Sequence, residues 1–257
     1  MPTHKIHLAI AKKVNDKLNL DLDQVMLGSV LPDIGEGKDH QVAHFQHGEK
    51  DLEGLSNPDE FVKKYKNKLD NPIMIGFLIH ILSDRFYNEY FFKHFYIYDE
   101  DDNGIGMILK GKRKLLNDEE RKNLKHREMF LYDRWLLNHN FVPKFNNNEC
   151  INKVIDIEES SFNKDKLKEY IKTANDDVDK VGFLSKLFIY NYKITKQKEL
   201  DKIFNDCIDY IIKYLNALNI TWYIIIMMKF DKYVFEWYNI GRFNLREELW
   251  ILFKKNQ

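Results

Sequence analysis

The spacing of apolar positions predicts helices along almost the whole chain. Apolar residues recur every four positions from Ile6 to Leu18, which places them on one face of a helix. The longest apolar segment follows Asn71-Pro72 and extends to about residue 95, and Gly76 is its one interior glycine. Asparagine followed by proline is typical of a helix start. Both segments are therefore expected to be helices that bury an apolar surface.

The remaining pattern is also helical. Further helices are expected at residues 22–30, from Asn57 onward, and at residues 117–140, 163–180 and 195–218. No segment alternates apolar and polar residues with the period of two that is typical of a half-buried strand. Only 11 glycines and 5 prolines interrupt 257 residues. We therefore predict an all-α, single-domain helical bundle over residues 1–220, with an aromatic-rich C-terminal extension at 221–257 that packs on it or at a homo-oligomer contact.

Composition limits the kinds of partner. The 40 basic and 40 acidic residues cancel, which argues against a protein that binds nucleic acid through bulk positive charge. The basic cluster at residues 110–114 is expected to be a solvated loop before a helix. The longest apolar run, Trp222 to Met228, is too short for a transmembrane segment. With two cysteines, no CxxC pair and no signal-peptide pattern, the chain is expected to be cytoplasmic.

The nine histidines all precede residue 140. One histidine and one aspartate among them and their neighbours, His80 and Asp84, also have a spacing that is common for metal ligands. His80 and Asp84 lie four positions apart in the predicted helix, so they project from one face. Phe77 and Ile81 make this face apolar, where an unpaired carboxylate would carry a large desolvation cost. A divalent cation would offset that cost. The alternative is a simple hydrogen-bonded His80–Asp84 pair.

The order of these residues resembles the zinc-dependent phospholipase C family and the related single-strand nucleases. The matching segments are Ile6-His7-Leu8-Ala9-Ile10-Ala11, Leu27-Gly28-Ser29-Val30-Leu31-Pro32-Asp33, Ala43-His44-Phe45 and Gly76-Phe77-Leu78-Ile79-His80-Ile81-Leu82-Ser83-Asp84. They cover about residues 3–95 of the chain. Members of that family are all-helical enzymes with up to three zinc ions.

The resemblance implies a ligand set. Asp33, His44, His80 and Asp84 would hold one metal ion, while His7 and Asp84 would contribute to a second, with Asp84 as the bridging carboxylate. Imidazole and carboxylate ligands suit zinc, but the same ligand types also bind iron and manganese. We expect one or two ions. Asp33 is also the implied general base, and His4, His47 and His94 are additional candidate ligands.

The chain departs from the family at the third metal site. The family has a histidine about six residues after the bridging aspartate, where this chain has Tyr90. Its later histidine with an acid four residues on is also absent, because Phe130 follows His126 and Pro143 follows His139 at that distance. Glu128, Asp133 and His139 are possible replacement ligands for the third metal, but none of them has the spacing found in the family. The third site is therefore expected to be lost.

By this resemblance, the chain is expected to be a phospholipase C-like hydrolase that uses metal-activated water on a small phosphoester or a phospholipid. Zero net charge disfavours long nucleic acids as substrates. The alternative is a non-catalytic or degenerate member of the same fold, with a structural metal, that serves as an interaction module. A third class, a different superfamily of helical phosphohydrolases, requires a histidine followed directly by an aspartate. This chain has only the reverse order, Asp39-His40, so the sequence disfavours that class.

Overall fold

A computed structural model describes residues 2–34, 40–48, 51–52, 54–155, 157–158, 162–182 and 187–238, with no side-chain detail at residue 40 or beyond residue 218. The chain divides into two compact units, residues 1–211 and 212–257. The candidate ligands all lie in the first unit. The expected boundary at residue 220 and the packing of residues 221–257 stay predictions, because those side chains lie outside the described residues.

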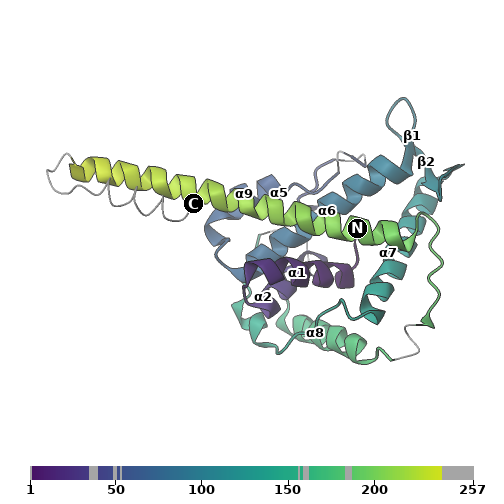
Figure 1. Ribbon diagram of the computed structural model, residues 1–257, viewed down its shortest axis with the longest axis horizontal. Helices are drawn as coiled ribbons and strands as arrows, with labels where there is room; N and C mark the ends of the chain where they lie inside the picture. The colour runs from purple at the N-terminus through teal and green to yellow at the C-terminus, as the bar shows by residue number, and fades with distance from the viewer. Residues whose placement is uncertain are drawn as a thin grey trace. The chain divides into compact units, whose positions relative to one another are not determined.

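The described part is mostly helical, as predicted (Figure 1). Four predicted helix starts are confirmed in detail, since the side chains of Asn57, Asn71, Asn117 and Asn163 each accept a hydrogen bond from the first turn. The helices are α1 His4–Leu18, α2 Leu22–Gly28, α3 Leu31–Ile34, α4 His40–Ala43, α5 Pro58–Tyr65, α6 Pro72–Phe95, α7 Asp118–Asn138, α8 Lys164–Asp179 and α9 Gln197–Tyr238, with 3₁₀ turns at Lys66–Lys68 and Glu149–Lys153. Helix α9 extends well beyond the predicted end at residue 218.

Helix α6 lies at the centre of the first unit, and α2 packs directly against it. Two glycines permit this close approach. A Cβ atom on Gly28 would lie 2.0 Å from the carbonyl oxygen of Ile73, and one on Gly76 would lie 2.1 Å from that of Val25. The two backbones are therefore in contact, and this brings the residues after α2 against the middle of α6.

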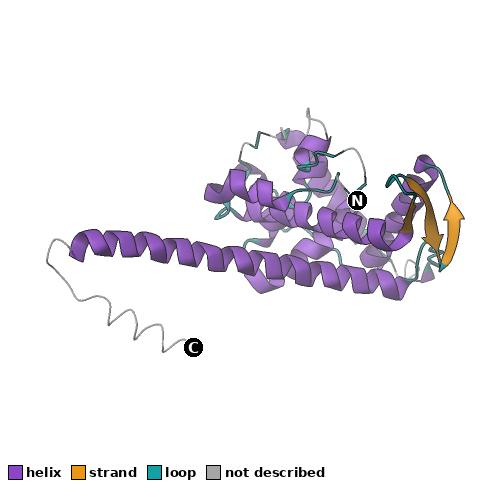
Figure 2. Ribbon diagram, turned by 90° about the horizontal axis from the view of Figure 1, so that it is seen from above, coloured by secondary structure: helices purple, strands orange, loops and turns teal. Residues whose placement is uncertain are grey.

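A three-stranded sheet corrects the all-α prediction. Antiparallel strands β1 Tyr96–Tyr98, β2 Gly104–Leu109 and β3 Lys112–Leu115 follow α6 in the order β1-β2-β3 (Figure 2). The basic cluster is thus a hairpin and not a loop. Its two turn residues, Lys110 and Gly111, have φ values of 50° and 82°, the positive pair that a tight hairpin turn requires. The strands are too short for an alternating pattern to be recognised.

Glu128 on α7 anchors a distant segment instead of serving as a metal ligand. Its buried carboxylate accepts hydrogen bonds from the backbone N–H groups of Lys193, Ile194 and Thr195, at 2.8, 3.0 and 3.0 Å. Burial raises the pKa of this carboxyl group, against the effect of the three N–H donors. The segment before α9 is therefore fixed to α7 by one side chain.

Replacing Glu128 by alanine is expected to lower the free energy of unfolding by about 3 kcal/mol, because backbone donors lose their charged acceptor in a poorly solvated place. Urea unfolding followed by circular dichroism measures the change. Glu119→Ala, an exposed acid on the same helix, is the matched control. Equal stability of the two variants would contradict an anchoring role.

Candidate metal centre

The structure brings together the five residues of the expected ligand set. His7 comes from α1, Asp33 from α3, His44 from the turn after α4, and His80 and Asp84 from α6. They form two groups that share His80, one with His7 and Asp84 and the other with Asp33 and His44. The side chains are fully buried except that of Asp33, which is 9% exposed.

Four ligand atoms lie near one another around His44 and His80. The Nε2 atoms of His44 and His80 are 3.0 Å apart, and Asp33 Oδ1 lies 3.2 Å from the first and 3.9 Å from the second. Asp84 Oδ2 lies 3.5 and 3.6 Å from the same two nitrogens. Zinc–ligand bonds of about 2.0–2.1 Å in a regular tetrahedron give edges of about 3.4 Å. These five distances are therefore close to those around one zinc ion, whereas Asp33 and Asp84 belong to different groups of mutually close ligand atoms.

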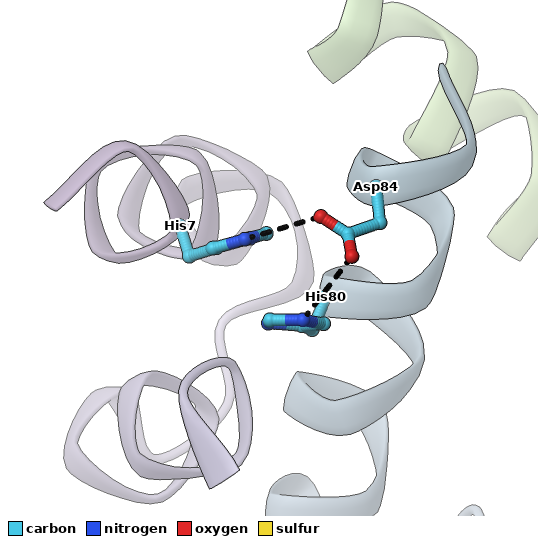
Figure 3. Close-up of side chains that lie close together, drawn as sticks. All are labelled: His7, His80 and Asp84. Carbon is cyan, nitrogen blue, oxygen red and sulfur yellow. Dashed lines mark ion pairs between the residues drawn. The ribbon is translucent and has the colours of Figure 1, made fainter. Parts of the chain in front are cut away.

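The other carboxylate oxygen of Asp84 faces a different histidine. Asp84 Oδ1 lies 3.4 Å from His7 Nε2, whereas Oδ2 faces His44 and His80 (Figure 3). The rings of His7 and His80 stack with centroids 3.9 Å apart. Asp84 thus lies between two groups of nitrogens, which is the arrangement of a carboxylate that bridges two cations.

Hydrogen bonds on the far side of the imidazoles leave their Nε2 atoms as acceptors. His80 Nδ1 is 2.8 Å from the carbonyl oxygen of Ser29, so Nδ1 carries the proton. The Ser83 hydroxyl donates to the His80 carbonyl oxygen and therefore accepts from His7 Nδ1, at 2.8 and 2.9 Å. Such bonds orient metal-ligating histidines. Sequence analysis did not single out Ser29 or Ser83, although both lie inside the matching segments.

Buried polar atoms at this centre have no hydrogen-bond partner among the described residues. They are His7 Nε2 and both carboxylate oxygens of Asp84. An unpaired buried carboxylate is costly. A divalent cation between these atoms would satisfy all of them. The donor set therefore fits a metal ion, and its chemistry suits zinc, iron or manganese.

The electrostatics of the metal-free cluster are strongly coupled. Burial would raise the pKa of Asp84, but the charge of His80 and the polar contacts of His7 and His80, at 3.4 and 3.6 Å, hold it well below its usual value. Burial would lower the pKa of His80, yet Asp33 and Asp84 raise it. Burial and the charge of His80 lower the pKa of His7 to about 4, despite Asp84. Without a metal, one shared proton on His80 partly replaces the cation.

These pKa shifts predict that the metal-free protein is most stable near pH 6.5. The pKa of His7 is about 6.5 in the unfolded state and about 4 in the folded state. Raising the pH from 4 to 6.5 therefore favours folding by about 3 kcal/mol. The lowered pKa values of Asp33 and Asp84 add stability that is lost at lower pH. The raised pKa of His80 stabilises the fold below pH 6.5, and this contribution is lost above it.

Urea unfolding in chelator over a pH series measures this dependence. In His7→Gln the rise in stability between pH 4 and 6.5 is expected to become shallower. A pH dependence identical to that of the wild type would contradict the assignment to His7.

The additional candidate ligands do not all join the cluster. His4 Nε2 lies 3.5 Å from Asp33 Oδ2, at the edge of the centre. His47 instead pairs with Glu60 at the surface, 2.6 Å away, and His94 is exposed and stacks on Tyr90. The structure therefore does not bring His47 or His94 into either ligand group.

The substitutes considered for a third site have other partners. Asp133 accepts hydrogen bonds from Thr3 and from the backbone N–H of Lys5, and His139 bonds the Trp135 carbonyl oxygen. Among the described residues, the two groups that share His80 are the clusters suited to a metal.

Single replacements of His47, His94 and His126 by alanine are expected to leave the metal content per chain unchanged, since these side chains lie outside both groups. Plasma mass spectrometry of each purified variant measures this content. Loss of one equivalent in any of the three would show that the ligand set is incomplete.

A cavity of about 480 Å³ gives access to the edge of the centre. Asp33 and His4 line it, together with residues from the N-terminus and from α7: Pro2, Thr3, Lys5, His126, Phe130 and Asp133. Behind His4, the ring of Tyr170 packs edge-on at 5.3 Å, and its buried hydroxyl has no partner among the described residues. No sequence signal connects Tyr170 on α8 with this centre, because their proximity depends on the tertiary fold.

Comparison with known proteins gives no match to any family model, to any curated protein or to any solved structure. Within the described residues, no helix combines the length and apolar character needed to cross a membrane.

Proposed function

We propose that this protein is a phospholipase C-like hydrolase that cleaves a phosphoester at a centre of one or two divalent ions, zinc being the expected metal. The observation that carries the proposal is the position of Asp84, whose two oxygens face His7 on one side and His44 and His80 on the other. Small phosphoesters and phospholipids are the proposed substrate classes. Two ions held there would act as Lewis acids on a phosphate oxygen and lower the pKa of a water molecule.

Asp33 is the residue placed to act on the attacking water. Its Oδ1 faces His44 and His80, while its Oδ2 faces His4 and its side chain reaches the cavity. Burial would raise its pKa, but the charge of His80 and a hydrogen bond with His44 lower it, so the carboxylate is ionised at neutral pH. As an ionised carboxylate at the boundary between the cluster and the cavity, Asp33 is proposed to orient the water or to accept its proton.

A second candidate function is a structural metal site in an interaction module. The burial of these ligands favours it, and Asp33, His44, His80 and Asp84 together would supply the four protein ligands that structural zinc sites have. In that case the protein would hold one ion and would not catalyse hydrolysis.

Hydrolysis of bis(4-nitrophenyl) phosphate by the full chain, in zinc and after chelation, tests the proposal. We expect turnover that chelator abolishes and zinc restores. His7→Ala removes the nitrogen that faces Asp84 Oδ1 and leaves Asp33, His44, His80 and Asp84, so it should keep one ion but lower kcat by about 100-fold or more. His139→Ala is the control, since His139 is exposed and lies outside both ligand groups and the cavity. Chelator-resistant turnover, or no turnover with any phosphoester tested, would overturn the proposal.

A further inference from the structure

A second cavity, of about 560 Å³, adjoins the one at the metal centre. The two share Lys5, Phe130 and Asp133 as lining residues, so they meet along one side of α7. The second cavity continues to Arg134 and to Lys180 just after α8. A molecule that reaches Asp33 through the first cavity can therefore extend along α7 into the second.

Two cations in the second cavity have no ion-pair partner among the described residues. The Arg134 guanidinium lies over two aromatic rings, 5.4 Å from the centroid of Phe188 and 5.9 Å from that of Phe130. Lys180 lines the same cavity. Lys5, in contrast, is neutralised by Asp177 at 3.0 Å and Asp133 at 3.7 Å. Of the charged residues that line the second cavity, Lys5, Asp133 and Asp177 form ion pairs with one another, and the cations Arg134 and Lys180 remain unpaired among the described residues.

The two phenylalanine rings beside Arg134 are large apolar side chains with a substantial exposed fraction. Phe130 is 55% exposed and Phe188 is 43% exposed. The guanidinium makes cation–π contacts with both rings, which reduces the entropy that Arg134 loses on binding an anion. The exposed surface of the two rings can contact an apolar or aromatic group. A planar guanidinium so held is suited to bidentate contact with a phosphate or carboxylate.

We infer that the substrate is a phosphoester with a second anionic group, joined by an organic linker, and that Arg134 and Lys180 bind this second group. The inference rests on the proposed function, because the first phosphate is taken to lie at the metal centre. The linker would lie along Phe130, between the two cavities. A substrate whose remote group is a cation would meet the charge of Arg134 and is disfavoured.

Isothermal titration calorimetry of the zinc-loaded full chain tests this inference without catalysis. The probes are methylphosphonate, with one anionic group, and alkane bisphosphonates of increasing chain length, with two. We expect at least one bisphosphonate to bind about tenfold tighter than methylphosphonate, the effect of one charge-assisted hydrogen bond. Arg134→Ala should remove this advantage while the affinity for methylphosphonate and the zinc content stay unchanged.

Arg127→Ala is the matched control, since Arg127 is exposed on the same helix but outside the second cavity. If methylphosphonate binds and no bisphosphonate binds more tightly, the inference fails and the proposed function stands. An advantage that survives in Arg134→Ala would also overturn the assignment. If neither kind of phosphonate binds to zinc-loaded protein, both the inference and the proposed function are contradicted.

Discussion

Replacing Asp84 by alanine is expected to reduce the metal content of the purified protein from one or two equivalents to near zero. Asp84 supplies one oxygen to each side of the cluster, so its loss removes a ligand from both proposed ions. Asp33 would then be the one carboxylate left in the ligand set to balance a dication in a buried site. Plasma mass spectrometry of the wild-type and variant proteins measures the difference.

The same substitution is expected to lower thermal stability more in zinc than in chelator. At a metal concentration about 1,000 times the dissociation constant, binding contributes about 4 kcal/mol per site, which corresponds to a rise in Tm of about 10 °C. The variant should lose this gain in zinc. In chelator it should lose only the contribution of the lowered Asp84 pKa, which comes from the neighbouring imidazoles.

Glu89→Ala is the control for this experiment, since Glu89 lies on α6 but pairs with Lys93 at the surface. Full metal content in Asp84→Ala would contradict the assignment of Asp84 as the bridging ligand. An equal loss of Tm in zinc and in chelator would show that Asp84 serves packing alone.

Replacing Gly76 by alanine is expected to destabilise the fold by about 3 kcal/mol or more, because overpacking against a fixed backbone cannot be relieved by a side-chain rotation. The added Cβ would lie 2.1 Å from the carbonyl oxygen of Val25, so α2 and α6 must separate. Separation would also move Ser29 away from His80 Nδ1. We therefore expect both a lower Tm and weaker metal binding.

Gly182→Ala is the matched control, since nothing lies within 4 Å of a Cβ atom at that position. Differential scanning calorimetry and metal titration of the two variants provide the test. A Gly76→Ala protein with wild-type stability would contradict the close contact of α2 and α6.

Local signals in the sequence account for what was predicted correctly. Asparagine caps and helical spacing depend on neighbours within a few residues, and they located the starts of α5, α6, α7 and α8. The four-residue spacing of His80 and Asp84 likewise fixes their common face. The convergence of His7, Asp33 and His44 on this pair came from the resemblance, because no local rule relates three separate elements.

The parts that sequence reasoning missed depend on contacts between distant residues. In the sequence, Glu128 has the pattern of an ordinary acidic residue on a helix. Its anchoring role becomes visible only from its hydrogen bonds to residues 193–195, which are distant in the sequence. The same holds for Tyr170, which reaches His4 only through the packing of α8. The hairpin was missed for another reason, since the positive φ of Lys110 is not a preference of lysine and gave no turn signal.

The most direct test of a two-ion centre is the metal content of the full chain, purified without a histidine tag and without added metal, measured by plasma mass spectrometry. We predict two equivalents of a divalent transition metal per chain, with zinc the expected one. A protein that contains no metal, stays folded in chelator and takes up none on reconstitution would contradict the account.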